Sequence, residues 1–402
     1  MAKKLWGGRF KKNIDKDFFE FQKSIQYDHK LAKYDIMHSL IHVIALYWAN
    51  ILSVKEKQFL LSALKEIQET INRGKFKHNM QSEDIHTDIH NKVEAKIGKL
   101  ALKLHTLRSR NDQIVFDEKS YCYEKGRLLV KFLADLGASL KFLGNKYRKT
   151  LIVGYTHTQR AQKIYFAEYI GAFCNMFERD KKRIFDFLTR IEIHIGAGAL
   201  AGSLIKKECY DKAIKDVAQS NLFSVSKNSI DDVSDRDFII EFLSDLSILQ
   251  MHLSRLSEDL IIFSTKEFNF IDLPEEFCTG SSLMPHKKNP DFLELVRGST
   301  GKIYGNLMAI LTIMKGMPLT YNRDMQLDKE PLFSSVETIE QELKIISKFI
   351  KKVELNLAKI NAALKDVGLS AVDEAAELVI KKGISFRDAH DIIGRKIREL
   401  EG

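Results

Sequence analysis

The chain has 402 residues, with 63 Lys and Arg against 54 Asp and Glu, a formal net charge of +9 and 45% hydrophobic residues. This composition excludes a mostly disordered chain, and the length is sufficient for two or three domains. Charges of both signs are interspersed, so the sequence has no polybasic arm of the kind that binds nucleic acid. The basic excess is compatible with anionic small-molecule ligands.

The cysteines and the N-terminus indicate the cellular compartment. Cys122, Cys174, Cys209 and Cys278 are far apart and form no CxxC pair, which is typical of reduced thiols in a cytosolic protein. The first residues, MAKKLWGGRF, lack the apolar stretch of a signal peptide. No apolar run approaches the roughly 18 residues of a membrane span. We therefore expect a soluble cytoplasmic protein.

Residues 1–107 are predicted to form shorter helices. Among them, the segment 83–90, EDIHTDIH, places His86 and His90 four residues apart on one helix face. This spacing is able to hold a metal ion. However, HExxH is not matched and the sequence suggests no third ligand, so we predict no metal site.

The segment 105–112, HTLRSRND, is dense in hydrogen-bond donors and precedes a predicted helix. Taken alone, it favours a capping segment with solvated arginines. The helix that follows has one apolar seam with alternating spacings of three and four residues. The members of this seam are Leu129, Leu133, Leu136, Leu140, Leu143 and Tyr147.

The segment 154–160, GYTHTQR, lies just ahead of a helix predicted over about 165–193. His157 stands between two hydroxyl side chains, where it is able to act as a general acid or base near neutral pH. A structural histidine is the alternative. Further along, GAGALAG (196–202) has a GxGxxxG spacing. Because no strand pattern precedes it, we expect close helix packing or a tight crossing and not a dinucleotide site.

Two later seams repeat the alternation of three and four residues over eight members each. They are Ile239, Phe242, Leu246, Leu249, Leu253, Leu256, Leu260 and Phe263, and Val336, Ile339, Leu343, Ile346, Ile350, Val353, Leu357 and Ile360. Each seam covers about 36 Å of helix, which is long for a compact monomer. With almost no strand pattern, the sequence predicts an all-α fold, a long-helix bundle whose core is shared between subunits.

All five prolines fall between Pro274 and Pro331, so this window differs locally from the helical remainder. It contains the loop 280–290, GSSLMPHKKNP, with two hydroxyls, glycine-freed amides, two ammonium groups and a carboxamide. Those groups suit a carboxylate that gains charge in a transition state. A basic surface loop is the alternative. The patterns GxSxG and GxxxxGK are both absent.

Together these segments resemble argininosuccinate lyase, within the fumarase/aspartase superfamily. The loop 280–290 looks like the signature of that superfamily. The narrower resemblance rests on motifs that occur in the family's order over nearly the whole chain. These are WGGRF, SIQYD, EDIHT, HTLRSRND, GYTHTQRAQ, GAGALAG, SDRDF, KNPDFLEL and LTYNRDMQLDKE.

The resemblance implies reversible cleavage of argininosuccinate to arginine and fumarate, in arginine biosynthesis, without a cofactor. It also implies a homotetramer whose active sites each draw on three subunits. By position, Ser281 matches the catalytic base, Lys287 and Asn289 match the groups that hold the developing charge, and His157 matches the general acid with Glu294 as its partner. The substrate-binding positions are Ser24, Asp28, His86, Arg110, Asn111, Thr156, Tyr321, Gln326 and Lys329.

The sequence departs from the family pattern at several positions. Leu107 replaces a glycine, Lys163 a proline, His90 a glutamate and Asp232 an alanine. The run 193–195 before GAGALAG is atypical, and the chain ends earlier than expected, which indicates an incomplete C-terminal domain. We expect three domains: 1–107 N-terminal, 108–356 central bundle and 357–402 C-terminal. The alternatives are a sister lyase acting on adenylosuccinate, aspartate or fumarate, and a catalytically impaired crystallin-like homologue.

Overall fold

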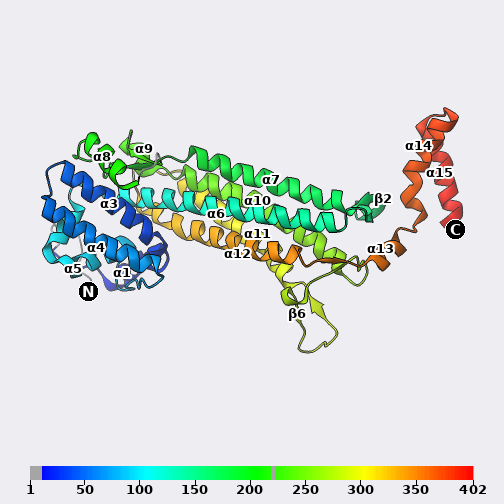
Figure 1. Cartoon of the computed structure of the whole chain (residues 1–402), viewed down its shortest axis with the longest axis horizontal. Coiled ribbons are helices and arrows are strands. Elements are labelled where there is room, and N and C mark those ends of the chain that lie inside the picture. Colours follow the sequence, from blue (N-terminus) through cyan, green and yellow to red (C-terminus); the bar gives the residue numbers. More distant parts are fainter. Residues whose placement is uncertain (1–10, 219–221, 402) are drawn as a thin grey trace. The chain divides into compact units, whose positions relative to one another are not determined.

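The computed structural model describes residues 11–218 and 222–401, so the predicted WGGRF motif (6–10) lies outside the described residues. The described chain is mainly helical, which confirms the predicted fold class (Figure 1). Five helices have 22 to 37 residues each. They are α6 (Arg110–Lys146), α7 (Phe166–Arg190), α10 (Asp237–Ser264), α11 (Asp291–Met314) and α12 (Lys329–Ile350).

The predicted apolar seams form the buried faces of these helices. All eight seam residues of α10 are buried, as are the first five of the seam in α6. The predicted continuation of the last seam to Ile360 is wrong, because α12 ends at Ile350. The chain turns at Lys351 and Lys352, forms a short paired strand at 354–355 and begins a new helix at Leu357. Val353 and Ile360 are buried, but they lie outside α12.

Contacts divide the chain into two compact units, each built from several segments. The first unit comprises the described residues up to Leu128, with Ile184–Leu246 and Ile303–Glu337. The second comprises Leu129–Arg183, Ser247–Lys302 and the described residues from Thr338 onward. Both units contain parts of the long helices. The three predicted domains stay predictions.

The first unit holds the short N-terminal helices. They are α1 (Lys16–Gln22), α2 (Ile25–Asp28), η1 (His29–Leu31), α3 (Ala32–Trp48), α4 (Val54–Asn72), α5 (Ile85–Ile97) and η2 (Gly98–His105). Ser53 and Glu56 close a capping box at the start of α4. The unit also contains α8 (Lys207–Ala218), α9 (Ser229–Ser234), η4 (Arg323–Asp328) and the parallel strands β3 (Ile193–Ile195) and β4 (Phe223–Val225).

Strand β3 directly precedes the glycine segment 196–202, so the expectation that no strand precedes these glycines is wrong. The segment is nevertheless a tight turn. Gly196, Gly198 and Gly202 all have positive φ, and a Cβ on Gly198 would lie 2.6 Å from the carbonyl oxygen of Gly202. Only glycine fits such a close backbone approach, which confirms the expected tight crossing.

The second unit holds the remaining strands and the C-terminal helices. Three antiparallel pairs form: β1 (Leu151–Thr156) with β2 (Gln159–Tyr165), β5 (Ile271–Asp272) with β8 (Glu354–Leu355), and β6 (Thr279–Gly280) with β7 (Lys288–Asn289). The helical elements are η3 (Glu275–Phe277), α13 (Leu357–Ala363), η5 (Val367–Ser370), α14 (Ala371–Lys382) and α15 (Phe386–Glu401).

Two further expectations have counterparts in the structure. The four cysteines are all free, as predicted. None of the helices in the described ranges combines the length and the apolarity that crossing a bilayer requires.

Candidate active site

Ser24 and Asp28 lie at the two ends of the short helix α2. Ser24 Oγ donates a 2.6 Å hydrogen bond to Asp28 Oδ2, and the backbone N–H of Ile85 donates to Asp28 Oδ1 at 3.1 Å. Burial and the nearby Asp84 carboxylate raise the pKa of Asp28 to about 6, although His86 acts in the opposite direction. These two predicted substrate-binding residues therefore form one buried polar pair at the start of α5.

The N-terminal end of α5 positions the next two predicted residues. Asp84 caps this helix by accepting from the backbone N–H of Thr87 at 2.7 Å. The same carboxylate pairs with Arg110 Nε at 3.0 Å, and Arg110 also donates to Thr87 Oγ1 at 3.2 Å. One helix cap thus fixes the guanidinium of Arg110, the first residue of α6. Its neighbour Asn111 donates to the carbonyl of Ala199 in the glycine turn.

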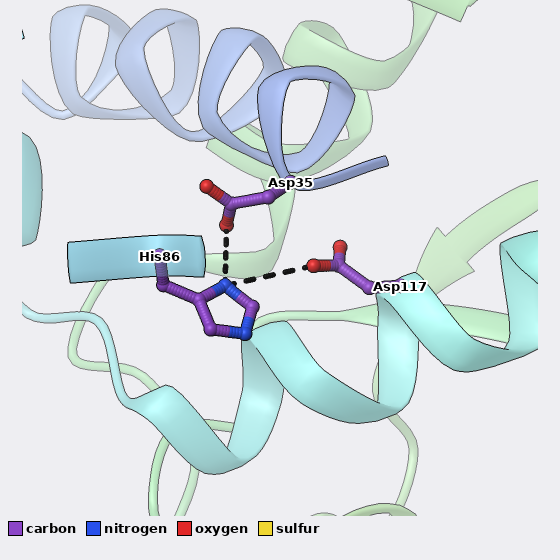
Figure 2. A group of neighbouring side chains, drawn as sticks. All are labelled: Asp35, His86 and Asp117. Carbon is purple, nitrogen blue, oxygen red and sulfur yellow. Dashed lines mark hydrogen bonds and ion pairs between the residues drawn. The ribbon is translucent and has the colours of Figure 1, made fainter. Parts of the chain in front are cut away.

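His86 lies between two buried carboxylates from different helices (Figure 2). His86 Nδ1 is 3.0 Å from Asp35 Oδ1 in α3 and 3.6 Å from Asp117 Oδ2 in α6. Gln113 donates a 2.7 Å hydrogen bond to the same oxygen of Asp35. The sequence analysis missed both aspartates. The available sequence signal was an acidic residue inside an otherwise apolar helical stretch, since such a charge requires a partner when buried.

The donor atoms of Asp35, His86 and Asp117 lie close enough together to surround a metal ion. The two carboxylates differ in their electrostatics. Burial raises the pKa of Asp35, but the charge and hydrogen bond of His86, followed by Arg108, outweigh it and hold this pKa well below its usual range. Burial raises the pKa of Asp117 well above its usual range. His90, the other histidine of the segment 83–90, contacts the ring of His105.

The segment 321–329 carries the last three predicted binding residues of the first unit. Gln326 Nε2 donates to the backbone oxygen of Gln22 at 2.8 Å, two residues before Ser24. Lys329, the first residue of α12, is buried and lies 2.8 Å from Glu118 Oε1 and 2.9 Å from Asp328 Oδ1. Burial raises the pKa of Tyr321. This segment is therefore linked both to the N-terminal residues and to α6.

In the second unit, His157 lies in the turn of the hairpin formed by β1 and β2. The helix predicted over about 165–193 is α7, which begins at Phe166, but the sequence did not predict the two strands that precede it. His157 and Thr158 both have positive φ, 53° and 59°. Thr156, the last residue of β1, and His157 are exposed. The turn therefore presents both predicted residues to solvent on a strained backbone.

The predicted signature loop is held by the short ladder of β6 and β7, where Gly280 pairs with Lys288 and Thr279 with Asn289. Ser281 Oγ accepts hydrogen bonds from the backbone N–H groups of Leu283 at 3.3 Å and Met284 at 3.0 Å. Lys287 is exposed directly before β7, and Glu294 is exposed in the first turn of α11. Two amides thus point at the hydroxyl that the sequence singles out as a base.

The structure therefore divides the predicted residues into two sets. Ser24, Asp28, His86, Arg110, Asn111, Tyr321, Gln326 and Lys329 belong to the first unit, and Thr156, His157, Ser281, Lys287, Asn289 and Glu294 to the second. Within the described part of the second unit, no hydrogen bond or ion pair joins the hairpin pair Thr156 and His157 to the loop residues.

Comparison with known proteins identifies the family. A family model described as "Lyase" matches residues 8–305. The chain is 44% identical over 395 residues to the argininosuccinate lyase of Caldanaerobacter subterraneus subsp. tengcongensis, covering 98% of this chain and 88% of the relative. It is 46% identical over 397 residues to that of Geotalea daltonii, covering 98% and 85%. The chain belongs to the argininosuccinate lyase family. This identity favours the predicted family over the sister lyases.

Solved structures of lower identity share the fold of this argininosuccinate lyase family member. A fumarate lyase:delta crystallin from Brucella melitensis bound to cobalt aligns with a TM-score of 0.81 at 18% identity, covering 94% of this chain and 86% of that chain. An EDDS lyase in complex with formate aligns with a TM-score of 0.78 at 22% identity, covering 95% and 75%.

Two departures from the argininosuccinate lyase pattern compensate for each other. Asp232, where alanine is usual, accepts from His194 in the atypical run 193–195, with 2.6 Å between His194 Nδ1 and Asp232 Oδ1. Ser226 Oγ also donates to Asp232. An alanine at position 232 would leave His194 without this carboxylate partner. The two departures from the pattern therefore form one polar contact.

Leu107 stands where the argininosuccinate lyase pattern has glycine, and the structure shows why glycine is usual. Leu107 has φ of 56° and is 39% exposed, so a branched side chain occupies left-handed backbone with little packing in return. Its carbonyl accepts from Ser203 Oγ in the glycine-turn region. At the other substituted position, Lys163 donates to Ser370 Oγ on the surface.

Proposed function

We propose that this chain catalyses the reversible elimination of argininosuccinate to arginine and fumarate, without a cofactor, as a cytoplasmic step of arginine biosynthesis. The observation that carries this proposal is the identity of 44–46% to argininosuccinate lyases over 98% of the chain. The predicted catalytic residues Ser281, His157, Lys287, Asn289 and Glu294 are all present.

Ser281 serves as the base in this proposal. A serine hydroxyl is a weak base, so its alkoxide has to be stabilised before it is able to remove the proton beside the substrate carboxylate. The amides of Leu283 and Met284 already donate to Ser281 Oγ. Hydrogen bonds to a charged form favour that form, and the loop therefore provides part of the required stabilisation. Lys287 supplies a cation in the same loop.

Proton removal from carbon leaves an aci-carboxylate with two negative charges on the former carboxylate. Lys287 and Asn289 hold this charge with an ammonium and a carboxamide donor. The carbon–nitrogen bond then breaks, its electron pair returns to the guanidinium nitrogen, and His157 donates the proton that this nitrogen takes up. Glu294 is the carboxylate partner proposed for His157. The products are fumarate and arginine. Ser281 then releases its proton to solvent and His157 takes one up, which restores both groups for the next turnover.

The proposed substrate contacts, apart from Thr156, come from the first unit. A ligand with three carboxylates and one guanidinium requires both cations and carboxylates at fixed positions. Arg110, Asn111 and Lys329 offer donors, whereas Asp28 offers a carboxylate for the guanidinium. Each of these side chains is already held by a neighbour, Asp28 by Ser24 and Lys329 by Glu118 and Asp328. Such pre-organisation lowers the cost of binding.

We further propose a homotetramer with active sites shared between subunits. Helix α11 supports this assembly. Its Gly298, Gly301, Gly305 and Met308 recur at spacings of three and four residues, and a Cβ added at any of the three glycines meets no atom within 4 Å. Met308 is 62% exposed. A helix face of this kind allows a second helix to approach closely. Helix α11 of a second subunit, related by symmetry, carries the same face and fits against it.

The test is fumarate release from argininosuccinate by the purified chain, followed by ultraviolet absorbance. Ser281→Ala is the matched control, and analytical ultracentrifugation confirms that both proteins assemble alike. Release by the parent and none by Ser281→Ala supports the reaction and the assigned base. A folded tetramer that releases no fumarate overturns the proposal and favours the crystallin-like alternative.

A further inference from the structure

Four charged side chains form a buried cluster around the ammonium of Lys329. The cluster, called here the charge quartet, consists of Glu118, Arg236, Asp328 and Lys329. Their side chains are 0%, 0%, 1% and 2% exposed. Glu118 comes from α6, Arg236 from the connection between α9 and α10, and the other two from the junction of η4 and α12. Three distant segments of the first unit therefore meet here.

The contacts connect all four members. Lys329 Nζ lies 2.8 Å from Glu118 Oε1 and 2.9 Å from Asp328 Oδ1. Arg236 Nε lies 2.5 Å from the other oxygen of Asp328, Oδ2, and 3.5 Å from Glu118 Oε2. Each carboxylate thus bridges the two cations. Arg236 is itself fixed, because its Nη1 donates to the backbone oxygen of Asp235 at 2.7 Å.

The quartet has two positive and two negative groups, so it is neutral when all four are charged. Burial by itself lowers the pKa of Lys329, but Asp328 and Glu118 outweigh this effect and hold the pKa above its ordinary value. Burial likewise raises the pKa of Asp328, and Lys329 and Arg236 outweigh it in the opposite direction. The ammonium of Lys329 therefore stays charged even though it is buried.

Buried ion pairs are a weak means of stabilising a fold, because desolvation offsets most of their attraction. A four-membered buried network is better explained by a requirement for one fixed cation. Lys329 is the member that the proposed function places at the substrate. Glu118, Arg236 and Asp328 have no assigned role, and Arg236 lies in the SDRDF segment.

We propose that Glu118, Arg236 and Asp328 are positioning residues that hold the Lys329 ammonium in place to bind a carboxylate of the substrate. This inference rests on the proposed function. Arg236 occupies one oxygen of Asp328, which leaves the other oxygen facing Lys329, and Glu118 fixes the ammonium from the opposite helix. Loss of either partner lets Lys329 move or leaves a buried charge without its counter-ion.

The test is a double-mutant cycle read as binding affinity. All variants are made in the Ser281→Ala background, which we expect to bind substrate without turnover, and Kd for argininosuccinate is measured by titration calorimetry. The single variants are Glu118→Gln, Arg236→Gln, Arg236→Lys and Lys329→Met, and the doubles combine each of the first two with Lys329→Met. Asp180→Asn is the control, because Asp180 forms a buried 2.7 Å pair with His252 in the second unit.

We expect Glu118→Gln and Arg236→Gln each to weaken binding by about tenfold or more, since truncating one partner of a buried pair is costly. In the Lys329→Met background the same changes should weaken binding by less than about twofold, because the residue through which they act is gone. Arg236→Lys, which keeps the charge, should recover part of the affinity. Asp180→Asn should bind like the background.

If Glu118→Gln and Arg236→Gln raise Kd by the same factor with and without Lys329→Met, their role is merely structural and the inference is overturned. So would an Arg236→Gln protein that binds normally. If Arg236→Gln does not fold, the nearly isosteric Glu118→Gln decides the cycle alone. If the Ser281→Ala background binds no argininosuccinate, the proposed function fails and this inference falls with it. The two failures are thus distinguishable, since the second appears before any quartet residue is changed.

Discussion

The hydroxyl of Ser24 donates a 2.6 Å hydrogen bond to the carboxylate of Asp28, and both side chains are buried. The contact joins the two ends of a single helical turn, and the first amide of α5 completes it from the other side. Burial opposes the charge of this carboxylate, so its ionised form costs the fold stability. Its pKa of about 6 expresses that opposition.

Asp28→Asn should therefore stabilise the protein at neutral pH. The folded-state pKa of Asp28 is raised from 3.8 to about 6, so the native state binds a proton that the unfolded state has lost in this window. The stability of the parent therefore falls as the pH rises from 3.8 to about 6. Asparagine removes the charge and keeps an oxygen for Ile85, with an expected gain of about 2 kcal/mol.

Urea unfolding of the parent and Asp28→Asn at a series of pH values checks this prediction. The difference in unfolding free energy should be near zero below about pH 4 and grow up to about pH 7. The groups that face Asp28 are Ser24, Asp84, His86 and Lys329, and all are unchanged in the variant. A gain that is independent of pH would contradict this explanation. Substrate affinity should fall, which separates the role of Asp28 in binding from its effect on stability.

Leu107→Gly is the second change expected to stabilise the chain. The backbone at Leu107 has φ of 56°, a conformation that costs a leucine roughly 1 kcal/mol more than a glycine. The midpoint of chemical unfolding should rise accordingly. Leu102→Gly is the control, since Leu102 is also a half-exposed leucine but lies within the helical element η2. Glycine there should destabilise by roughly 1 kcal/mol. A loss of stability in both variants would show that packing of Leu107 outweighs its backbone strain.

The long helices were predictable because their apolar residues repeat with the helical period. The seam from Ile239 to Phe263 is buried along its whole length. The end of α12 was not predictable in this way, because Val353 and Ile360 keep the same spacing although the backbone turns at Lys351. Periodicity reports which side chains are buried and does not by itself report which element buries them.

The hairpin around His157 was missed for a different reason. Strand β2, over residues 159–165, is largely exposed and polar, so it lacks the alternation that marks a half-buried strand. Its turn uses His157 and Thr158 at positive φ instead of the usual Asn-Gly. The partners of the site residues were missed because they act at long range. Asp35 and Asp117 meet His86 only when three helices have packed together.

The pair of His194 and Asp232 should be coupled energetically. Burial raises the pKa of Asp232, but the hydrogen bonds from His194 and Ser226 outweigh burial and the net shift is downward. The stabilisation is therefore present above the ordinary value of 3.8 and is lost as the pH falls through the lowered value. In a double-mutant cycle of Asp232→Ala and His194→Ala, we expect a coupling free energy of about 1 kcal/mol at pH 7.

Unfolding of the parent, both single variants and the double variant at pH 7 and at a series of acidic pH values measures this coupling. As the pH falls through the lowered pKa of Asp232, protonation of the carboxylate should reduce the coupling. If Asp232→Ala is as stable as the parent, the contact adds nothing, and the two departures from the family pattern would be unrelated. Fumarate release should be unchanged in all three variants, because neither residue belongs to the predicted site.

A charge on the outer face of α11 should break the proposed tetramer. Met308 is 62% exposed beside three glycines whose added Cβ atoms meet open space, whereas the opposite side of the helix carries the fully buried Leu293, Ile303 and Ile310. Met308→Glu places a carboxylate where a second helix would pack, and burying an unpaired charge costs several kcal/mol. Sedimentation velocity should show smaller species, and fumarate release should fall with the tetramer because the sites are shared.

Ile380→Glu, at an 82% exposed position on α14, is the control and should sediment like the parent. A Met308→Glu protein that keeps the parent's sedimentation and activity would show that this face of α11 is free in solution, and the shared bundle would then have to use another helix.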